Sequence, residues 1–130
     1  MYTLITGPIA VSVEPRFLDE QSAPEEGHFV WTYRVRIENR GTYAVTLRNR
    51  HWAIINAAGI VQETSGSGVV GVEPIILPGE TFEYTGGTPL STPSGIMIGR
   101  YMMQAETGEV FDIDVPAFSL DSPYDAATVN

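Results

Sequence analysis

Three glycines, Gly66, Gly68 and Gly71, stand in the spacing G-x-G-x-x-G within the stretch SGSGVVG. This spacing binds the diphosphate of a nucleotide when a strand enters the loop and a helix leaves it, because the free amides at the helix start then face the anion. Here the chain leaves through Val72-Glu73-Pro74, which does not begin a helix. No acidic residue lies about twenty residues further on, where such a fold binds a ribose. A dinucleotide-binding unit is therefore excluded.

Two interpretations of this glycine loop remain. In the first, successive backbone amides of Gly66, Ser67, Gly68 and Gly71 form a concave anion-binding site without a helix. In the second, the glycines supply positive φ angles and close backbone packing where the chain crosses between sheets. A glycine motif outside its strand-loop-helix context favours the second interpretation.

The residues available for catalysis are few. The chain contains no cysteine, which excludes disulfides, thiolate nucleophiles and cysteine-based metal sites. His51 is the one histidine in a segment predicted to be regular, between Arg50 and Trp52, and no G-x-S-x-G motif accompanies it. We expect His51 to lie in the core or at its rim, beside a buried Trp52, and we predict no catalytic residue and no enzymatic activity. A hydrolase built on His51 and a carboxylate is the alternative.

Two groups of residues contain side chains that can bind metal ions. Asp112 and Asp114 alternate along a predicted strand, so their carboxylates share one face about 6.5–7 Å apart. Magnesium and calcium recruit further oxygens, and alternating charges are typical of a solvated outer face. Glu25, Glu26 and His28 lie in a predicted loop with a single imidazole. We predict no metal site and no cofactor.

The charged residues also restrict the partners. The formal charge is -9 and all seven basic residues are arginine. Nucleic acid is excluded, because affinity for its backbone comes from Lys and Arg neutralising phosphates. Five of the seven arginines fall between residues 34 and 50, and four of them are candidates for a protein-interaction surface together with the glycine loop: Arg34, Arg36, Arg48 and Arg50.

The sequence shows no pattern typical of a membrane span or a secretory signal. No apolar run approaches the ~18 residues that span a bilayer, and the start MYTLITGPIAVSVEP lacks the basic and apolar regions of a secretory signal. We therefore expect a soluble, cytoplasmic protein that does not bind a membrane.

The elements that would position these residues are strands, because apolar residues recur with a period of two along most of the chain. The segment FVWTYRVRIEN, residues 29–39, is the clearest example. In the next strand, Val45 and Leu47 are expected to face inward and Arg48 and Arg50 outward. The connection from Ile37 to Val45 is compatible with a hairpin or with an arch between two sheets.

Turn residues divide the rest of the chain. Ala58-Gly59 and Thr107-Gly108 each predict a hairpin, whereas Pro74 and Pro78 exclude a central strand around residues 75–77. Roughly seven to nine short strands predict an all-β, two-sheet antiparallel sandwich of immunoglobulin or fibronectin type III kind. We expect one domain over residues 1–130, with about 121–130 forming a flexible polar tail.

Several blocks along nearly the whole chain together resemble the bacterial ApaG family: VSVEPRFLDEQSAPEEGHFVWTYRVRIEN, RNRHW, GSGVVG, PGETFEYTGGTPL, PSGIMIGRYMM and FDIDVPAFSL. The family's loop usually carries an acidic residue where this chain has Ser67. The resemblance implies a fibronectin type III-like sandwich without an assigned enzymatic activity, and domains of this kind in eukaryotic F-box proteins look like protein-interaction modules. It also implies a link to cobalt resistance and magnesium efflux, and gene neighbourhood to a diadenosine tetraphosphate hydrolase.

From these observations we expect a non-enzymatic binding module whose partner is another protein. We expect Met97, Tyr101, Met102 and Met103 first to fill the core. One face of their strand, or an exposed edge strand that pairs with an extended segment, would serve as a further contact. The alternative is a small-ligand module that binds pyrophosphate or a dinucleoside polyphosphate at GSGVVG. The sequence leaves the oligomeric state open.

Overall fold

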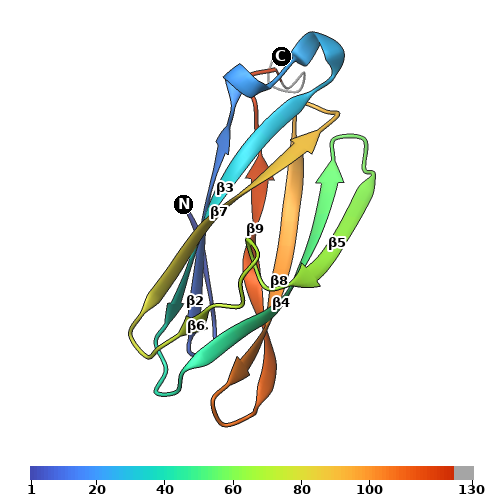
Figure 1. Cartoon of the computed structure of the whole chain (residues 1–130). Helices are drawn as coiled ribbons and strands as arrows, with labels where there is room; N and C mark the ends of the chain where they lie inside the picture. The colour runs from blue at the N-terminus through green and yellow to red at the C-terminus, as the bar shows by residue number, and fades with distance from the viewer. Residues whose placement is uncertain (125–130) are drawn as a thin grey trace.

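Two antiparallel sheets packed face to face make up the protein (Figure 1). The structure is a computed structural model and describes residues 1–124. One sheet has the order β1-β2-β3-β7 and the other the order β5-β4-β8-β9, with the short β6 paired to β4. The strands are β1 Tyr2–Thr6, β2 Ile9–Phe17, β3 Phe29–Asn39, β4 Val45–Asn56, β5 Val61–Ser67, β6 Ile75–Ile76, β7 Thr81–Leu90, β8 Gly95–Ala105 and β9 Val110–Leu120.

The predicted all-β sandwich is thus confirmed. Two short 3₁₀ turns, η1 Asp19–Gln21 and η2 Pro24–Glu26, join β2 to β3. No α-helix occurs among residues 1–124, and nothing in that range forms a helix long and apolar enough to cross a membrane.

The core lies between the sheets and follows the period of two. On β3 the inward side chains are all 8% exposed or less, namely Phe29, Trp31, Tyr33, Val35 and Ile37. The facing sheet contributes Trp52, Tyr101 and Phe118, and the rings of Tyr33 and Trp52 lie 5.3 Å apart. Each large apolar side chain buried in this way contributes about 1.5–3 kcal/mol, so the alternation decides which face of each strand turns inward.

The connection between β3 and β4 is an arch, because these strands belong to different sheets. Asn39 is fully buried at this crossing. Its side-chain amide donates to the carbonyls of Tyr43 and Ile76, and its side-chain oxygen accepts from the amide of Gly41. These bonds satisfy backbone groups that leave the sheet at the arch.

The two predicted hairpins are confirmed as β4–β5 and β8–β9. The two-proline segment forms only the two-residue β6 at the edge of β4, as expected for a stretch that lacks two backbone donors. Thus the strand assignments that rest on turn residues and on proline agree with the structure.

The start of the predicted tail is packed against the domain. Ser122 is buried, and the carbonyl of Asp121 accepts a hydrogen bond from the indole of Trp31. The Tyr124 hydroxyl donates to Asp19 at 2.9 Å, and its ring lies near Phe17. Residues 121–124 are therefore part of the sandwich, and residues 125–130 lie outside the described residues.

A tight turn follows β5 within the glycine loop. Val69 and Val72 exchange both of their backbone hydrogen bonds, at 2.9 Å each, and enclose Val70 and Gly71. Both enclosed residues have positive φ, 44° for Val70 and 81° for Gly71, as in a type I′ turn. A β-branched residue in this region is strained, and Val70 is also 61% exposed, so little packing offsets the strain.

We expect Val70→Asn to stabilise the protein by about 1 kcal/mol, because Asn-Gly is the preferred central pair of a type I′ turn and the strain at Val70 is of this order. The measurement is the free energy of unfolding by chemical denaturation. Val72→Asn is the matched control, since Val72 does not have positive φ. A Val70→Asn variant no more stable than the original chain contradicts the prediction.

Candidate functional site

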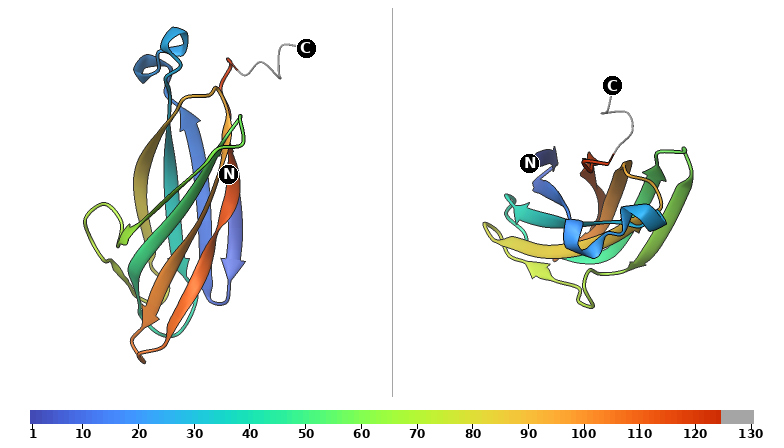
Figure 2. Two further views of the ribbon diagram at one scale, coloured as in Figure 1. Left: turned by 90° about the vertical axis from the view of Figure 1, so that its right-hand side faces the viewer. Right: turned by 90° about the horizontal axis from the view of Figure 1, so that it is seen from above.

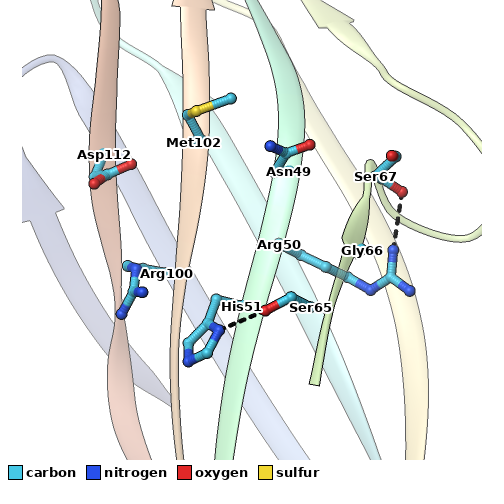
Figure 3. A pocket seen from close by; sticks show the side chains of 9 residues that line it. All are labelled: Asn49, Arg50, His51, Ser65, Gly66, Ser67, Arg100, Met102 and Asp112. Carbon is cyan, nitrogen blue, oxygen red and sulfur yellow. Dashed lines mark hydrogen bonds between the residues drawn. The ribbon is translucent and has the colours of Figure 1, made fainter. Parts of the chain in front are cut away.

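A shallow groove of about 520 Å³ lies on the five-stranded sheet, where β5, β4, β8 and β9 run side by side (Figure 3). Four strands and the start of the glycine loop supply its lining: Asn49, Arg50, His51, Ser65, Gly66, Ser67, Arg100, Met102 and Asp112. Most of these side chains are polar, and they include His51, Arg50 and Arg100. We therefore treat this groove and the neighbouring β5 as the candidate functional site.

A β-bulge in β4 arranges the arginines of this site. The pairing of β4 with β8 shifts between Leu47 and Asn49, so Arg48 is an extra residue in the strand. After the bulge, Arg50 lies on the same face as the buried Trp52, and the prediction that Arg48 and Arg50 both point outward is wrong for Arg50. One extra residue reverses the facing of every side chain that follows it.

Arg50 holds the glycine loop from the inner side. Its Nη1 donates to the carbonyls of Ser67 and Gly68, at 2.9 Å each, and Figure 3 shows its side chain reaching across β5 to the loop. A Cβ on Gly66 would lie 2.9 Å from the Arg50 guanidinium, so a larger residue there would force this side chain to shift. Hydrogen bonds from a charged donor are about twice as strong as neutral ones.

The amides of the glycine loop are largely used within the chain. Gly68 donates its amide to the Arg48 carbonyl at 2.7 Å, and Val69 and Val72 donate to each other. Gly68 also has a φ of 57°, and a Cβ there would lie 2.0 Å from the Val72 carbonyl oxygen. Space for Arg50 at Gly66 and positive φ at Gly68 and Gly71 thus explain the spacing of the three glycines, as in the second interpretation. The loop, however, joins β5 to β6 within one sheet and does not cross between sheets.

Three buried tyrosines lie close to Arg50 on the inner side. Tyr84 and Tyr101 share a hydrogen bond between their hydroxyls, and Tyr33 lies beside them. Burial raises the pKa of the Tyr101 and Tyr84 hydroxyls well above the usual value, and burial also raises the pKa of Tyr33. The positive charge of Arg50 opposes all three shifts. These phenols stay protonated at neutral pH and serve packing and hydrogen bonding.

On the outer face, His51 lies between a serine and a glutamate. Its Nδ1 is 2.7 Å from Ser65 Oγ, and its Nε2 is 3.3 Å from Glu63 Oε1. The residue types match those of a serine hydrolase, in which, however, the acid is buried and the serine sits on a sharp turn. Here the Glu63 side chain is 65% exposed and Ser65 is within the regular strand β5. The arrangement is a solvent-exposed cross-strand network.

Arg100 and the two predicted aspartates complete the outer face. Arg100 stands opposite His51 on β4 and opposite Asp114 on β9, and Asp112 stands opposite Met102. Among residues 1–124, no carboxylate lies within ion-pairing distance of the Arg100 guanidinium. Asp112 and Asp114 share one exposed face, as predicted. In the same part of the chain, no three His, Asp or Glu side chains gather in a group that could hold a metal ion.

The four arginines proposed for an interaction surface lie apart. Arg34 and Arg36 are on the outer face of the four-stranded sheet, where both pair with Glu83, at 2.7 and 2.6 Å. The Arg34 guanidinium lowers the pKa of the Glu83 carboxyl through a direct hydrogen bond. Arg48 belongs to the other sheet and bonds to Gln104 and Glu73. Sequence clustering therefore does not produce one basic surface.

Arg100 and Ser65 were missed as members of this site. They lie 35 positions apart and meet only because β5, β4 and β8 are neighbours in one sheet. The period-two pattern of residues 95–105 places Arg100 on the outward face, but the segment around Ser65 has no apolar alternation and gives no such signal.

Comparison with known proteins places the chain among its relatives. Residues 19–105 match the family described as the ApaG domain. Two relatives called Protein ApaG, from Paramagnetospirillum magneticum and Rhodospirillum centenum, are each 55% identical over 130 residues and 100% of both chains. The crystal structure of the putative ApaA protein from Bordetella pertussis has a TM-score of 0.86 at 45% identity, covering 89% of this chain and 94% of that one. The C-terminal domain of wzt, with a TM-score of 0.58 at 11% identity over 92% of this chain and 76% of that one, shares the fold alone. The resemblance found in the sequence is confirmed, and the chain belongs to the ApaG family.

Proposed function

We propose that this protein is a non-enzymatic binding module that holds an extended segment of a partner protein along the edge of β5. The observation that carries the proposal is the position of β5, which ends its sheet with its outer side unpaired in the described part of the chain (Figure 2). An edge of this kind binds an extended peptide by adding it to the sheet as a further strand.

The hydrogen-bonding groups of β5 alternate between its two sides. The amide of Asn56 donates to Ile60, and the amide of Gly68 donates to Arg48, which fixes the pattern at both ends of the β4–β5 pair. By the antiparallel alternation, the even-numbered residues between them bond to β4. The outward amides and carbonyls then belong to Val61, Glu63, Ser65 and Ser67.

The composition of β5 supports the proposal. Edge strands commonly carry lysine, proline or a bulge that prevents pairing with other chains. The segment Val61–Ser67 contains no lysine and no proline, and Glu63 is its single charged residue. Its pairing with β4 runs without a register shift. A partner strand would therefore meet a regular and nearly neutral edge.

The other sheet edges are less suited to a partner. The edges formed by β1 and β9 meet each other, where Thr6 Oγ1 accepts from the amide of Asp114 and the Tyr2 hydroxyl accepts from the amide of Ser119. The free edge of β7 contains Pro89, which removes a donor, and two adjacent glycines, Gly86 and Gly87, which weaken it more than the single Gly66 weakens β5. This contrast favours β5 as the binding edge.

The implied link to cobalt and magnesium homeostasis fits this proposal through a partner. The residues 1–124 offer no cluster of metal ligands, so a role in ion transport would depend on a protein that the module binds. We propose that binding, rather than catalysis, is also the role of the groove, because the exposed Ser65–His51–Glu63 network lacks the buried acid of a hydrolase.

The alternative of a diphosphate site at the glycine loop has less support. The loop carbonyls of Ser67 and Gly68 accept hydrogen bonds from the Arg50 guanidinium. The amides of Gly68, Val69 and Val72 donate hydrogen bonds within the chain. We expect pyrophosphate with magnesium, at millimolar concentration, to leave the amide NMR shifts of residues 65–72 unchanged. Saturable shifts confined to these amides would show the alternative to be correct.

Proline substitution tests the proposed binding edge. We expect Glu63→Pro to abolish capture of the partner from a cell extract, because it removes an outward amide while the bonds to β4 remain. Glu63→Ala removes the same carboxylate but keeps the amide, so it should capture the partner normally. Quantitative mass spectrometry of the captured proteins measures the difference.

A second proline variant separates loss of binding from loss of stability. Thr64→Pro removes an amide that bonds to β4 and should destabilise the fold by about 1–3 kcal/mol, the cost of one buried unpaired group. Glu63→Pro should keep a denaturation midpoint near that of the original chain. A folded Glu63→Pro protein that captures the same partner in the same amount would refute binding at this edge.

A further inference from the structure

The edge of β5 has exposed apolar residues at both of its ends. Ile60 and Val61, at 60% and 54% exposed, stand at its start, and Val70 and Val72, at 61% and 50%, follow its end. A strand that runs antiparallel to β5 with the same sequence brings the start of one copy beside the end of the other. In both copies at once, Ile60 and Val61 would then lie opposite the last residues of β5 in the other copy, next to the turn that carries Val70 and Val72.

We infer that the partner this edge fits is a second copy of the chain, paired through β5 about a two-fold axis at Thr64. The inference rests on the proposed binding edge and names its occupant. With Thr64 on the axis, Val61 pairs with Ser67 of the second copy and Glu63 with Ser65 of the second copy. The outward groups of Val61, Glu63 and Ser65 and the amide of Ser67 then take part in the hydrogen-bonded pairs, whereas the Ser67 carbonyl already accepts from Arg50.

Neighbouring registers are less favourable. An axis at Glu63 would place the two Glu63 carboxylates directly opposite each other, which is destabilising across a strand pair. An axis at Ser65 would leave the outward groups of Val61 beyond the end of the other β5. The register centred on Thr64 avoids both defects, and it sets two β-branched side chains against each other at the axis.

The side chains on the outer face support the same register. Glu63 would lie next to Ser65 of the second copy, whose row continues through His51 to Arg100. Ser65 is uncharged, so no like charge would stand directly opposite Glu63 in this register. Arg100 lies two strands beyond Ser65 and is too far away to pair with Glu63 of the second copy.

The net charge limits the strength of this dimer. Each copy carries a formal charge of -9, so two copies repel each other at low ionic strength. A single strand pair also buries less surface than a permanent interface does. The dimer is therefore concentration-dependent and strengthens as salt screens the repulsion. Self-pairing and capture of another protein use the same edge, so they exclude each other.

Thr64→Cys tests the axis directly, because the chain contains no cysteine of its own. Two cysteines opposite each other in a non-hydrogen-bonded antiparallel pair are close enough for a disulfide. We expect Thr64→Cys to form a disulfide-linked dimer under mild oxidation at least tenfold faster than Gln62→Cys. Gln62 is the matched control, since it is exposed on the same face of β5 but would lie about 13 Å along the strand from Gln62 of the second copy.

Sedimentation velocity gives an independent measurement. The original chain should show a dimer fraction that rises with protein and salt concentration, and Glu63→Pro should remain monomeric under the same conditions. Equal rates of disulfide formation for Thr64→Cys and Gln62→Cys, or a monomer at every concentration, would overturn the inference. If Glu63→Pro then still abolishes capture of a different protein, the binding edge stands and only self-pairing is wrong.

Discussion

The guanidinium group of Arg50 lies beneath β5 and donates hydrogen bonds to two consecutive carbonyls of the glycine loop. It reaches them because a bulge at Arg48 turns Arg50 toward the inner face of β4. Glycine at position 66 leaves room for the side chain. The contact holds the end of β5 and the start of the loop, and the pairing with β4 along the rest of the strand sets the position of the free edge.

The same contact gives the glycine spacing a structural reason that does not involve a phosphate. An anion site needs amides that converge on an empty space, and a helix supplies them without cost to its own bonds. In this loop the carbonyls of Ser67 and Gly68 accept hydrogen bonds from the Arg50 guanidinium. The amide of Gly68 donates to the Arg48 carbonyl and so continues the pairing of β5 with β4. The loop ends β5 at Ser67 and leaves the outer side of the strand unpaired within residues 1–124.

Much of the fold could be predicted from the sequence, because burial imposes a period of two and turn residues mark the hairpins. The facing of Arg50 could not, since one extra residue in β4 is invisible where both Arg48 and Arg50 are polar. The candidate site could not be predicted either. Segment β5 has no apolar alternation that would mark it as a strand, and Arg100 lies beside His51 only because β8 is the neighbour of β4 in the sheet. Residues 121–124 looked like a tail because their anchors, Trp31 and Asp19, lie far away in the sequence.

Hydrogen exchange in an Arg50→Met variant tests the central claim most directly, because methionine keeps much of the length of the side chain and removes its charge and donors. The account predicts that the amides of Gly68, Val69 and Val72 exchange at least tenfold faster, about 1.4 kcal/mol of local stability, while the amides of β2 and β3 are unchanged. Arg34→Met, on the other sheet, should alter none of these amides. Unchanged exchange in the loop of Arg50→Met would contradict the account, since the loop and the edge of β5 would then be held by something else.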